Sequence, residues 1–244
     1  MRCISVRTVC MLFFAGVMVC RAAGAATPAP APAAALAFKN GQTVAFVGDS
    51  ITRDGFSTIS GYGQLVVRAL AANGIVITPI RAGNGGECST NMLARIDGII
   101  AKKPDWVSLS CGVNDVGFSP DKSNVSLEDY QAATRAMVEK IQAAGVSVLL
   151  LTPTMIGEDP ANPQNRRLEP YLTHLRALAQ EKRCLLADLN AAMRDAIRQK
   201  GAGRTSRLPG EAGLFLRDGV HMNPLGDMMM ARAKSRAECG RTPS

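Results

Sequence analysis

The sequence predicts an α/β protein, a three-layer α/β/α sandwich built around a five-stranded parallel sheet. Two observations predict this class. Short apolar segments alternate along the chain with longer stretches that keep helical spacing. Most of the short segments are almost continuously apolar, as strands are when helices cover both faces of a parallel sheet. The 244 residues, 47% of them apolar, are enough for one large core.

The five predicted strands are TVAFVG (43–48), IVITPI (75–80), WVSLSC (106–111), VSVLLL (146–151) and CLLADL (184–189). In sheets of this class, ligands bind beyond the carboxyl ends of the strands. A functional site is therefore expected in the segments at that edge, which are 48–50, 81–88, 112–115 and the long loops 153–167 and 200–216.

Start and stop signals for helices lie between the strands. They are a stop at Asn73-Gly74, a capping box at Ser126 and Asp129, and a start at Asn223-Pro224. An apolar stripe over 168–179 predicts a further helix. In the last helix, Met228–Met230 is expected to fill the core rather than to bind a metal.

The first 26 residues differ from the rest of the chain. Arg2 and Arg7 precede a 12-residue apolar run (9–20), which is too short to span a bilayer, and small residues follow it. We expect residues 1–26 to be a secretory signal peptide, 27–37 a Pro/Ala spacer and 38–244 the folded domain. A signal anchor is the alternative for residues 1–26. With the signal removed, the protein is expected to be secreted or periplasmic, without a stable membrane span.

The net charge of +8 does not identify a partner. Lysine and arginine are scattered, and aromatic residues make up only 5% of the chain, so nothing favours nucleic-acid binding. Four cysteines follow the predicted signal: Cys88, Cys111, Cys184 and Cys239. None forms a C-x-x-C pair, and the sequence predicts no metal site from them.

A serine, a histidine and an aspartate occupy positions suited to nucleophilic catalysis. Ser50 directly follows an apolar strand and needs a nearby base to become a nucleophile. Of the two histidines, His174 lies on a helical stripe, where it is expected to be a surface or half-buried residue, and His221 lies in a loop. Asp218 precedes His221 by three residues, a spacing that lets its carboxylate reach the imidazole. Ser50 as a helix N-cap and Asp218–His221 as an ordinary polar turn remain open alternatives.

Two further loops offer hydrogen-bond donors at the same edge of the sheet. Residues 81–88 (RAGNGGEC) hold three glycines, and Cys88 takes the place that a third motif glycine would need for dinucleotide binding. The loop could instead aim one backbone N–H at an oxyanion. Asn114, after the third strand, could supply a side-chain amide. A tight glycine turn and an Asx-turn are the structural alternatives.

Taken together, these blocks resemble the SGNH-hydrolase family, also called GDSL-like esterases and lipases. The matching segments are GDSI (48–51), GNGGE (83–87), GVND (112–115) and DGVH (218–221), which span nearly the whole predicted domain. The resemblance implies a flavodoxin-like SGNH fold and hydrolysis of acyl esters through an acyl-enzyme without a cofactor.

The resemblance also implies a role for each matching residue. Ser50 is the expected nucleophile, His221 the general base and acid, and Asp218 the residue that orients His221. The backbone N–H groups of Ser50 and Gly86, with the Asn114 side chain, are expected to form the oxyanion hole. Block two departs from the family pattern, and because Gly85 adjoins Gly86 the glycine assignment could shift by one position. Cys88 and Cys111 flank these elements, an arrangement that a disulfide between them could explain.

Two other functions compete with this hypothesis. Residues 48–54 also fit a G-D-x-x-x-D magnesium block of haloacid-dehalogenase-type phosphatases, but no Asp-x-Asp nucleophile block occurs in the chain. Asp54 is therefore left without a role, and Asp49 is expected to support the turn. The other alternative is a non-catalytic, secreted module that binds carbohydrate or a surface. The expected substrate is a small-molecule or polysaccharide ester, with O-acetyl or short-chain groups favoured because the loop 153–167 is polar.

Overall fold

The structure, a computed structural model, describes residues 37–119, 121–200 and 212–238. The predicted signal peptide (1–26) and nearly all of the spacer (27–37) lie outside the described residues, so both stay predictions. Part of the predicted loop 200–216 and Cys239 lie outside them too.

The core of the fold is a parallel sheet of five strands in the order β2-β1-β3-β4-β5. The strands are β1 (Thr43–Gly48), β2 (Thr78–Gly83), β3 (Trp106–Ser110), β4 (Ser147–Leu151) and β5 (Leu185–Ala187). All four strand pairs are parallel, with Thr43 opposite Thr78 and Val44 opposite Trp106. β1, β3 and β4 are almost fully buried, which accounts for their mainly apolar sequences.

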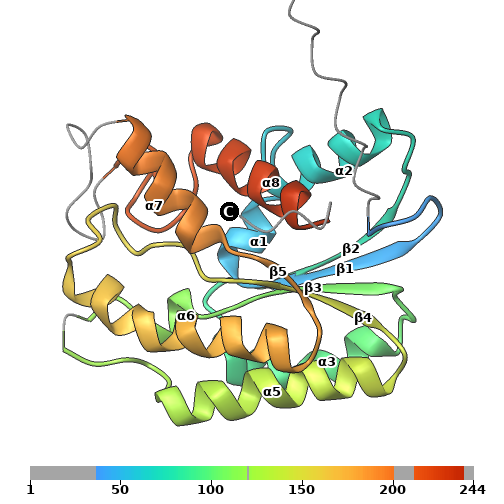
Figure 1. The fold of residues 1–244 in the computed structure, drawn as a ribbon, viewed down its shortest axis with the longest axis horizontal. Helices are drawn as coiled ribbons and strands as arrows, with labels where there is room; N and C mark the ends of the chain where they lie inside the picture. The colour runs from blue at the N-terminus through green and yellow to red at the C-terminus, as the bar shows by residue number, and fades with distance from the viewer. Residues whose placement is uncertain (1–36, 120, 201–211, 239–244) are drawn as a thin grey trace, which may run out of the picture. The chain divides into compact units, whose positions relative to one another are not determined.

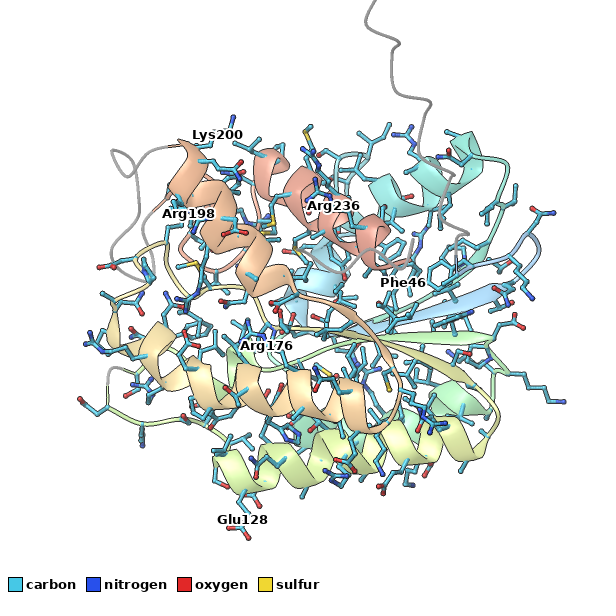
Figure 2. The ribbon with its side chains drawn as sticks, viewed as in Figure 1. Phe46, Glu128, Arg176, Arg198, Lys200 and Arg236 are labelled. Atoms are coloured by element: carbon cyan, nitrogen blue, oxygen red, sulfur yellow. The ribbon has the colours of Figure 1, made fainter. Side chains whose placement is uncertain are left out.

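Helices cover both faces of this sheet and confirm the three-layer prediction. Figure 1 shows α2, α7 and α8 on one face and α3, α5 and α6 on the other. The helices are α1 (Ser50–Asp54), α2 (Tyr62–Ala72), α3 (Ser89–Ile100), α4 (Val113–Val116), α5 (Leu127–Ala143), α6 (Pro163–Glu181), α7 (Leu189–Lys200) and α8 (Pro224–Glu238). α2 and α7 both pack on α8, and α5 packs between α3 and α6. Phe46 of β1 lies between the sheet and α8 (Figure 2), with the Lys234 ammonium 3.7 Å from its ring centroid.

The helix signals are confirmed where the chain caps its helices with its own side chains. Ser126 Oγ accepts the Asp129 N–H and donates to the Asp129 carboxylate, so Ser126 is the N-cap of α5, but Asp129 bonds its hydroxyl rather than its backbone N–H, which a capping box would require. Asn223 Oδ1 accepts the N–H groups of Leu225 and Gly226 at the start of α8. Each of these caps satisfies backbone donors that the first turn of a helix leaves unpaired.

Three structural predictions need correction. The second strand is Thr78–Gly83, not 75–80, because its register pairs Gly48 with Gly83. β2 lies at the edge of the sheet and is partly exposed, so apolarity does not mark its limits. Met228 is 60% exposed and only Met230 of the methionine run is fully buried, because α8 presents one face to the core. Residues 163–167 belong to α6 rather than to a rim loop.

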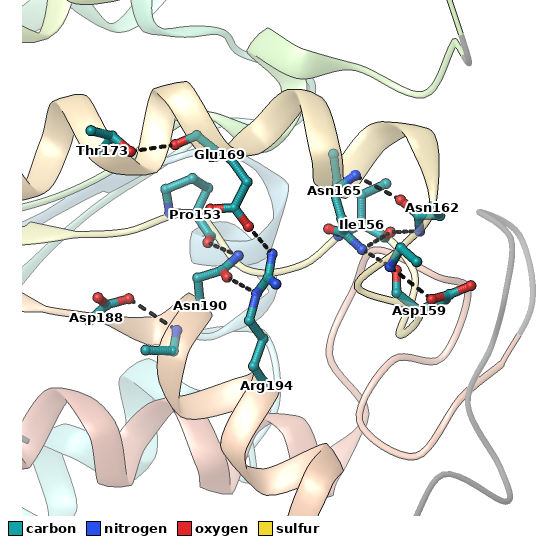
Figure 3. Close-up of polar contacts among 12 residues, drawn as sticks. Pro153, Ile156, Asp159, Asn162, Asn165, Glu169, Thr173, Asp188, Asn190 and Arg194 are labelled. Carbon is teal, nitrogen blue, oxygen red and sulfur yellow. Dashed lines mark hydrogen bonds and ion pairs between the residues drawn. The ribbon is translucent and has the colours of Figure 1, made fainter.

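The connection from β4 to α6 is held together by its own polar side chains (Figure 3). Asn165 accepts the Ile156 N–H at 3.0 Å and donates to the carbonyls of Ile156 and Asp159. Asn162 caps α6 by accepting the Asn165 N–H at 2.7 Å. The polarity of this segment therefore serves the fold, because most of these side chains turn inward.

Where the structure describes the chain, it contains no helix that is both long and apolar enough to cross a lipid bilayer.

Candidate active site

Ser50, His221 and Asp218 form a continuous chain of polar contacts at the carboxyl edge of the sheet. Ser50 Oγ lies 2.9 Å from His221 Nε2, and His221 Nδ1 lies 2.8 Å from Asp218 Oδ2. Ser50 and His221 are 171 residues apart in sequence, so only the fold brings them together. This is the order of contacts that a serine nucleophile, a general base and an orienting carboxylate require.

The spacing of three residues works because Asp218 closes a turn around its own backbone. Asp218 Oδ1 accepts the N–H groups of Val220 and His221 at 3.1 and 2.8 Å. Gly219 sits in this turn at φ +81°, where a side chain would be strained. The other carboxylate oxygen is left to face the imidazole.

The charge of Asp218 decides the tautomer of His221. Partial burial raises the pKa of Asp218, but hydrogen bonds from the backbone and imidazole of His221 outweigh that effect and hold the pKa below its usual value. Ionised Asp218 can only accept, so Nδ1 of His221 carries the proton. His221 Nε2 then presents its lone pair to the Ser50 hydroxyl.

Ser50 is presented by a tight junction between β1 and α1. Ser50 is not the N-cap of α1; Asp49 is, with its Oδ1 accepting the Ile51 N–H at 2.9 Å. Burial raises the pKa of Asp49 to about 6, against the lowering effect of the Ile51 hydrogen bond. Asp49 thus supports the turn, as expected, and the Ser50 hydroxyl remains available to His221.

The two loops that carry Gly86 and Asn114 meet beside this junction. Asn114 in α4 is buried, and its Nδ2 donates to the carbonyl of Glu87 at 3.0 Å. A carboxamide has two N–H bonds, so this contact fixes the orientation of Asn114 and leaves a second N–H for a ligand. Gly86 is exposed at φ +78° next to Glu87. The assignment of the Ser50, Gly86 and Asn114 donors to an oxyanion hole stays a prediction.

Gly112 allows α4 to start where it does. Its φ is +128°, and a Cβ there would lie 2.8 Å from a side-chain carbon of Pro153. Any larger residue would strain the backbone and displace the segment that carries Asn114.

Arg95 is a supporting residue that sequence reasoning missed. Its Nε donates to both oxygens of Glu87 at 3.0 and 2.8 Å, and its Nη2 donates to the Ala82 and Gly48 carbonyls at 2.9 and 3.3 Å. One guanidinium therefore ties the Gly86 loop to the ends of β1 and β2. The signal was a Glu and an Arg eight residues apart, which is too common a pattern to single out.

The possible disulfide between Cys88 and Cys111 is wrong, since both thiols are free. Burial, and then the nearby Asp115 carboxylate, raises the pKa of Cys88 to about 11 and that of Cys111 well above its usual value. Both are neutral thiols at physiological pH and poor nucleophiles. Asp115 itself accepts the backbone N–H and the hydroxyl of Ser89, which tie α4 to the start of α3.

Asp54, which had no predicted role, forms ion pairs with Arg53 at 2.9 Å and Arg217 at 2.6 Å. A pocket opens on this pair, with Ile51 and Met222, the neighbours of Ser50 and His221, in its lining. The rest of the lining is polar: Asp54, Ser57, Thr58, Arg217 and Asp227. A polar hollow thus adjoins the Ser50 and His221 segments.

Comparison with known proteins identifies the class that this fold and site define. Residues 46–228 match the sequence model of the GDSL-like Lipase/Acylhydrolase family. The acetylxylan esterase of Geobacillus stearothermophilus is 29% identical over 212 residues, covering 80% of this chain and 92% of its own. Esterase TesA of Pseudomonas aeruginosa is 32% identical over 150 residues, covering 59% of this chain and 69% of its own.

Solved structures agree with these matches. The crystal structure of Axe2, an acetylxylan esterase from Geobacillus stearothermophilus, superposes with a TM-score of 0.70 at 27% identity, covering 85% of this chain and 98% of its own. That of the acetyl xylan esterase AlAXEase gives 0.71 at 30% identity, covering 78% and 96%. Structures described as catalytic mutants of Axe2 replace a serine, an aspartate, and a histidine three positions after that aspartate.

The chain therefore belongs to the GDSL-like lipase/acylhydrolase family, the SGNH hydrolases, and has the fold of that family. It is a carboxylic ester hydrolase.

Proposed function

We propose that this esterase removes acetyl groups from carbohydrate esters through a Ser50–His221–Asp218 triad and a covalent acyl-enzyme. The observation that carries the proposal is the contact chain from Ser50 Oγ through His221 to Asp218. The Axe2 variants support it, because the altered aspartate and histidine of that relative have the spacing of Asp218 and His221.

In the first half of the reaction, Ser50 Oγ attacks the ester carbonyl carbon while His221 Nε2 takes the hydroxyl proton. The carbonyl π electrons move to the oxygen, which becomes an oxyanion facing the N–H groups of Ser50, Gly86 and Asn114. Each such donor contributes on the order of 3 kcal/mol to transition-state stabilisation. The bond between the carbonyl carbon and the sugar oxygen then breaks, and His221 returns its proton to that oxygen, which leaves as a sugar hydroxyl.

Water completes the cycle by the same route. His221 removes a proton from a water molecule, whose oxygen attacks the acetyl carbon bound to Ser50. Collapse of the second tetrahedral intermediate releases acetic acid and returns the proton from His221 to Ser50 Oγ. Asp218 stays ionised and stabilises the imidazolium in both halves.

The polarity of residues 153–167 does not support the preference for a carbohydrate ester, because these polar side chains bond the backbone of their own segment. The preference rests on the acetylxylan esterases among the relatives and on the polar pocket around Asp54 and Arg217. A pocket lined by carboxylates, hydroxyls and a guanidinium can bind sugar hydroxyls and offers little to a long acyl chain.

Phe118, four residues after Asn114, is a candidate for contact with a saccharide. It follows α4, is 44% exposed, and is the only aromatic residue among the exposed large apolar side chains of the described residues. Gln164 donates to its carbonyl at 3.0 Å, which holds the backbone at Phe118 in place. We propose that the apolar face of a sugar ring packs on this phenyl ring.

Acetate release from acetylated xylo-oligosaccharides tests the substrate class, with p-nitrophenyl acetate and p-nitrophenyl palmitate for comparison. We expect acetate from the oligosaccharides and little hydrolysis of the palmitate. Phe118→Ala should raise KM for the oligosaccharide about tenfold and leave p-nitrophenyl acetate hydrolysis nearly unchanged.

Val76→Ala is the matched control, because Val76 is exposed but precedes β2. It therefore lies at the amino ends of the strands, whereas the proposed site lies at their carboxyl ends. This variant should change neither KM for the oligosaccharide nor the rate of p-nitrophenyl acetate hydrolysis. Equal losses on both substrates in Phe118→Ala would contradict a saccharide platform, and faster cleavage of the palmitate would contradict the substrate class.

The non-catalytic binding module is the alternative function, and the esterase relatives do not favour it. We also propose export with removal of residues 1–26. N-terminal sequencing of the protein recovered outside the cytoplasm tests this, and a mature protein that begins at Met1 would contradict it.

A further inference from the structure

A fully buried carboxylate accepts hydrogen bonds from the segment that leads directly into Asp218 and His221. Glu158, in the connection between β4 and α6, has no exposed surface. Its Oε1 accepts the N–H groups of Phe215 and Leu216 at 2.6 and 2.9 Å, and its Oε2 accepts the Leu214 N–H at 2.8 Å. Three successive backbone amides therefore converge on one side chain.

These amides immediately precede the triad turn. Asp218 and His221 follow Leu216 within five residues, and the Gly157 N–H donates to the carbonyl of Gly219 inside the turn at 2.6 Å. On the far side of the turn, the Asn223 N–H donates to the Phe215 carbonyl at 2.9 Å. The loop that positions His221 is thus closed at its base and attached to residues 157 and 158.

Glu158 can hold that loop because its own segment is fixed. It lies between Ile156 and Asp159, whose backbone groups bond Asn162 and Asn165 at the start of α6 (Figure 3). The Glu158 carboxylate therefore links the loop that holds Asp218 and His221 to the fixed connection between β4 and α6.

The arrangement requires two acceptor oxygens on one side chain, which a carboxylate supplies and an amide does not. Three backbone N–H groups point at the Glu158 carboxylate, and their dipoles stabilise it in its buried position. A glutamine has one acceptor oxygen, and its NH₂ group would face a backbone N–H, donor against donor. Gly213 leaves room for the Glu158 carboxylate, because a Cβ at position 213 would lie 2.4 Å from the Glu158 carboxyl carbon.

We propose that Glu158 is a positioning residue that keeps His221 aligned with Ser50. The inference rests on the proposed role of His221 as the base. Glu158 touches no reacting atom, so its loss should lower kcat and leave KM nearly unchanged. Misplacement of a catalytic group by about 1 Å costs on the order of 100-fold in rate.

The test compares Glu158→Gln, His221→Ala and the double variant by kcat on p-nitrophenyl acetate. Glu158→Gln should lower kcat about 100-fold with KM nearly unchanged. In the His221→Ala background the same substitution should have no further effect, because the group it positions is gone. Glu169→Gln, which removes the exposed carboxylate paired with Arg194, is the matched control and should leave kcat unchanged.

Additive losses in the double variant, or unchanged kcat in Glu158→Gln, would overturn the inference. If Glu158→Gln does not fold, Gly213→Ala replaces it, since the added methyl group must displace the Glu158 carboxyl while the charge remains. A folded Gly213→Ala variant with normal kcat would overturn the inference equally. Full activity in His221→Ala would instead refute the proposed base, so the two failures are distinguishable.

Discussion

The two histidines of the chain, His174 and His221, lie in different surroundings, and these give the same side chain different properties. His174 Nε2 contacts Thr134 Oγ1 at 2.8 Å, and its ring packs edge-on to Tyr130. Burial, together with the Arg135 charge, lowers the pKa of His174, so it is neutral at physiological pH and joins α5 to α6. His221 instead lies between a hydroxyl and a carboxylate at the edge of the sheet.

At the residue scale, His221→Ala should lower kcat on p-nitrophenyl acetate by at least about 1,000-fold, whereas His174→Ala should retain most of it. In the wild type, activity should fall at acid pH, because a protonated imidazole cannot accept the Ser50 proton. Steady-state rates between about pH 5 and about pH 8 measure both effects. Similar losses in the two variants, or a flat pH profile, would count against His221 as the base.

Among the elements, the junction of β1 and α1 places the proposed nucleophile, Ser50, next to a buried acid. Asp49 caps α1 from a site where burial raises its pKa from 3.8 to about 6. The folded protein therefore binds the Asp49 proton more tightly than the unfolded chain does. Through this group, the free energy of unfolding falls as pH rises from 3.8 to about 6. Asp115, whose pKa burial also raises, acts in the same direction.

Asp49→Asn should remove the Asp49 contribution and keep the cap, because an asparagine oxygen can still accept the Ile51 N–H. A shift of two pKa units corresponds to about 3 kcal/mol, so the variant should gain up to that amount relative to wild type above pH 6. Urea unfolding of both proteins between about pH 4 and about pH 7 measures the difference. Parallel pH dependences in the two proteins would contradict the burial argument.

For the whole molecule, the sequence predicted the layers and singled out the residues of the proposed triad because both leave local patterns in the chain. Buried strands read as apolar runs, and Ser50 and Asp218 to His221 lie directly in short motifs. The edge strand β2 was misplaced because exposed residues such as Arg81, which packs over Phe56, do not follow that pattern. Arg95 and Glu158 were missed because their functions depend on backbone groups brought close by folding, up to 58 residues away.

The most direct test of the central claim is covalent labelling of Ser50. A p-nitrophenyl alkylphosphonate should react when Ser50 Oγ attacks phosphorus and p-nitrophenolate leaves, giving a stable phosphonyl serine. Intact mass and peptide mapping should find one adduct on the peptide that contains Ser50. It should be absent in Ser50→Ala and form far more slowly in His221→Ala. An adduct at another residue, or ester hydrolysis by Ser50→Ala at the wild-type rate, would contradict the account.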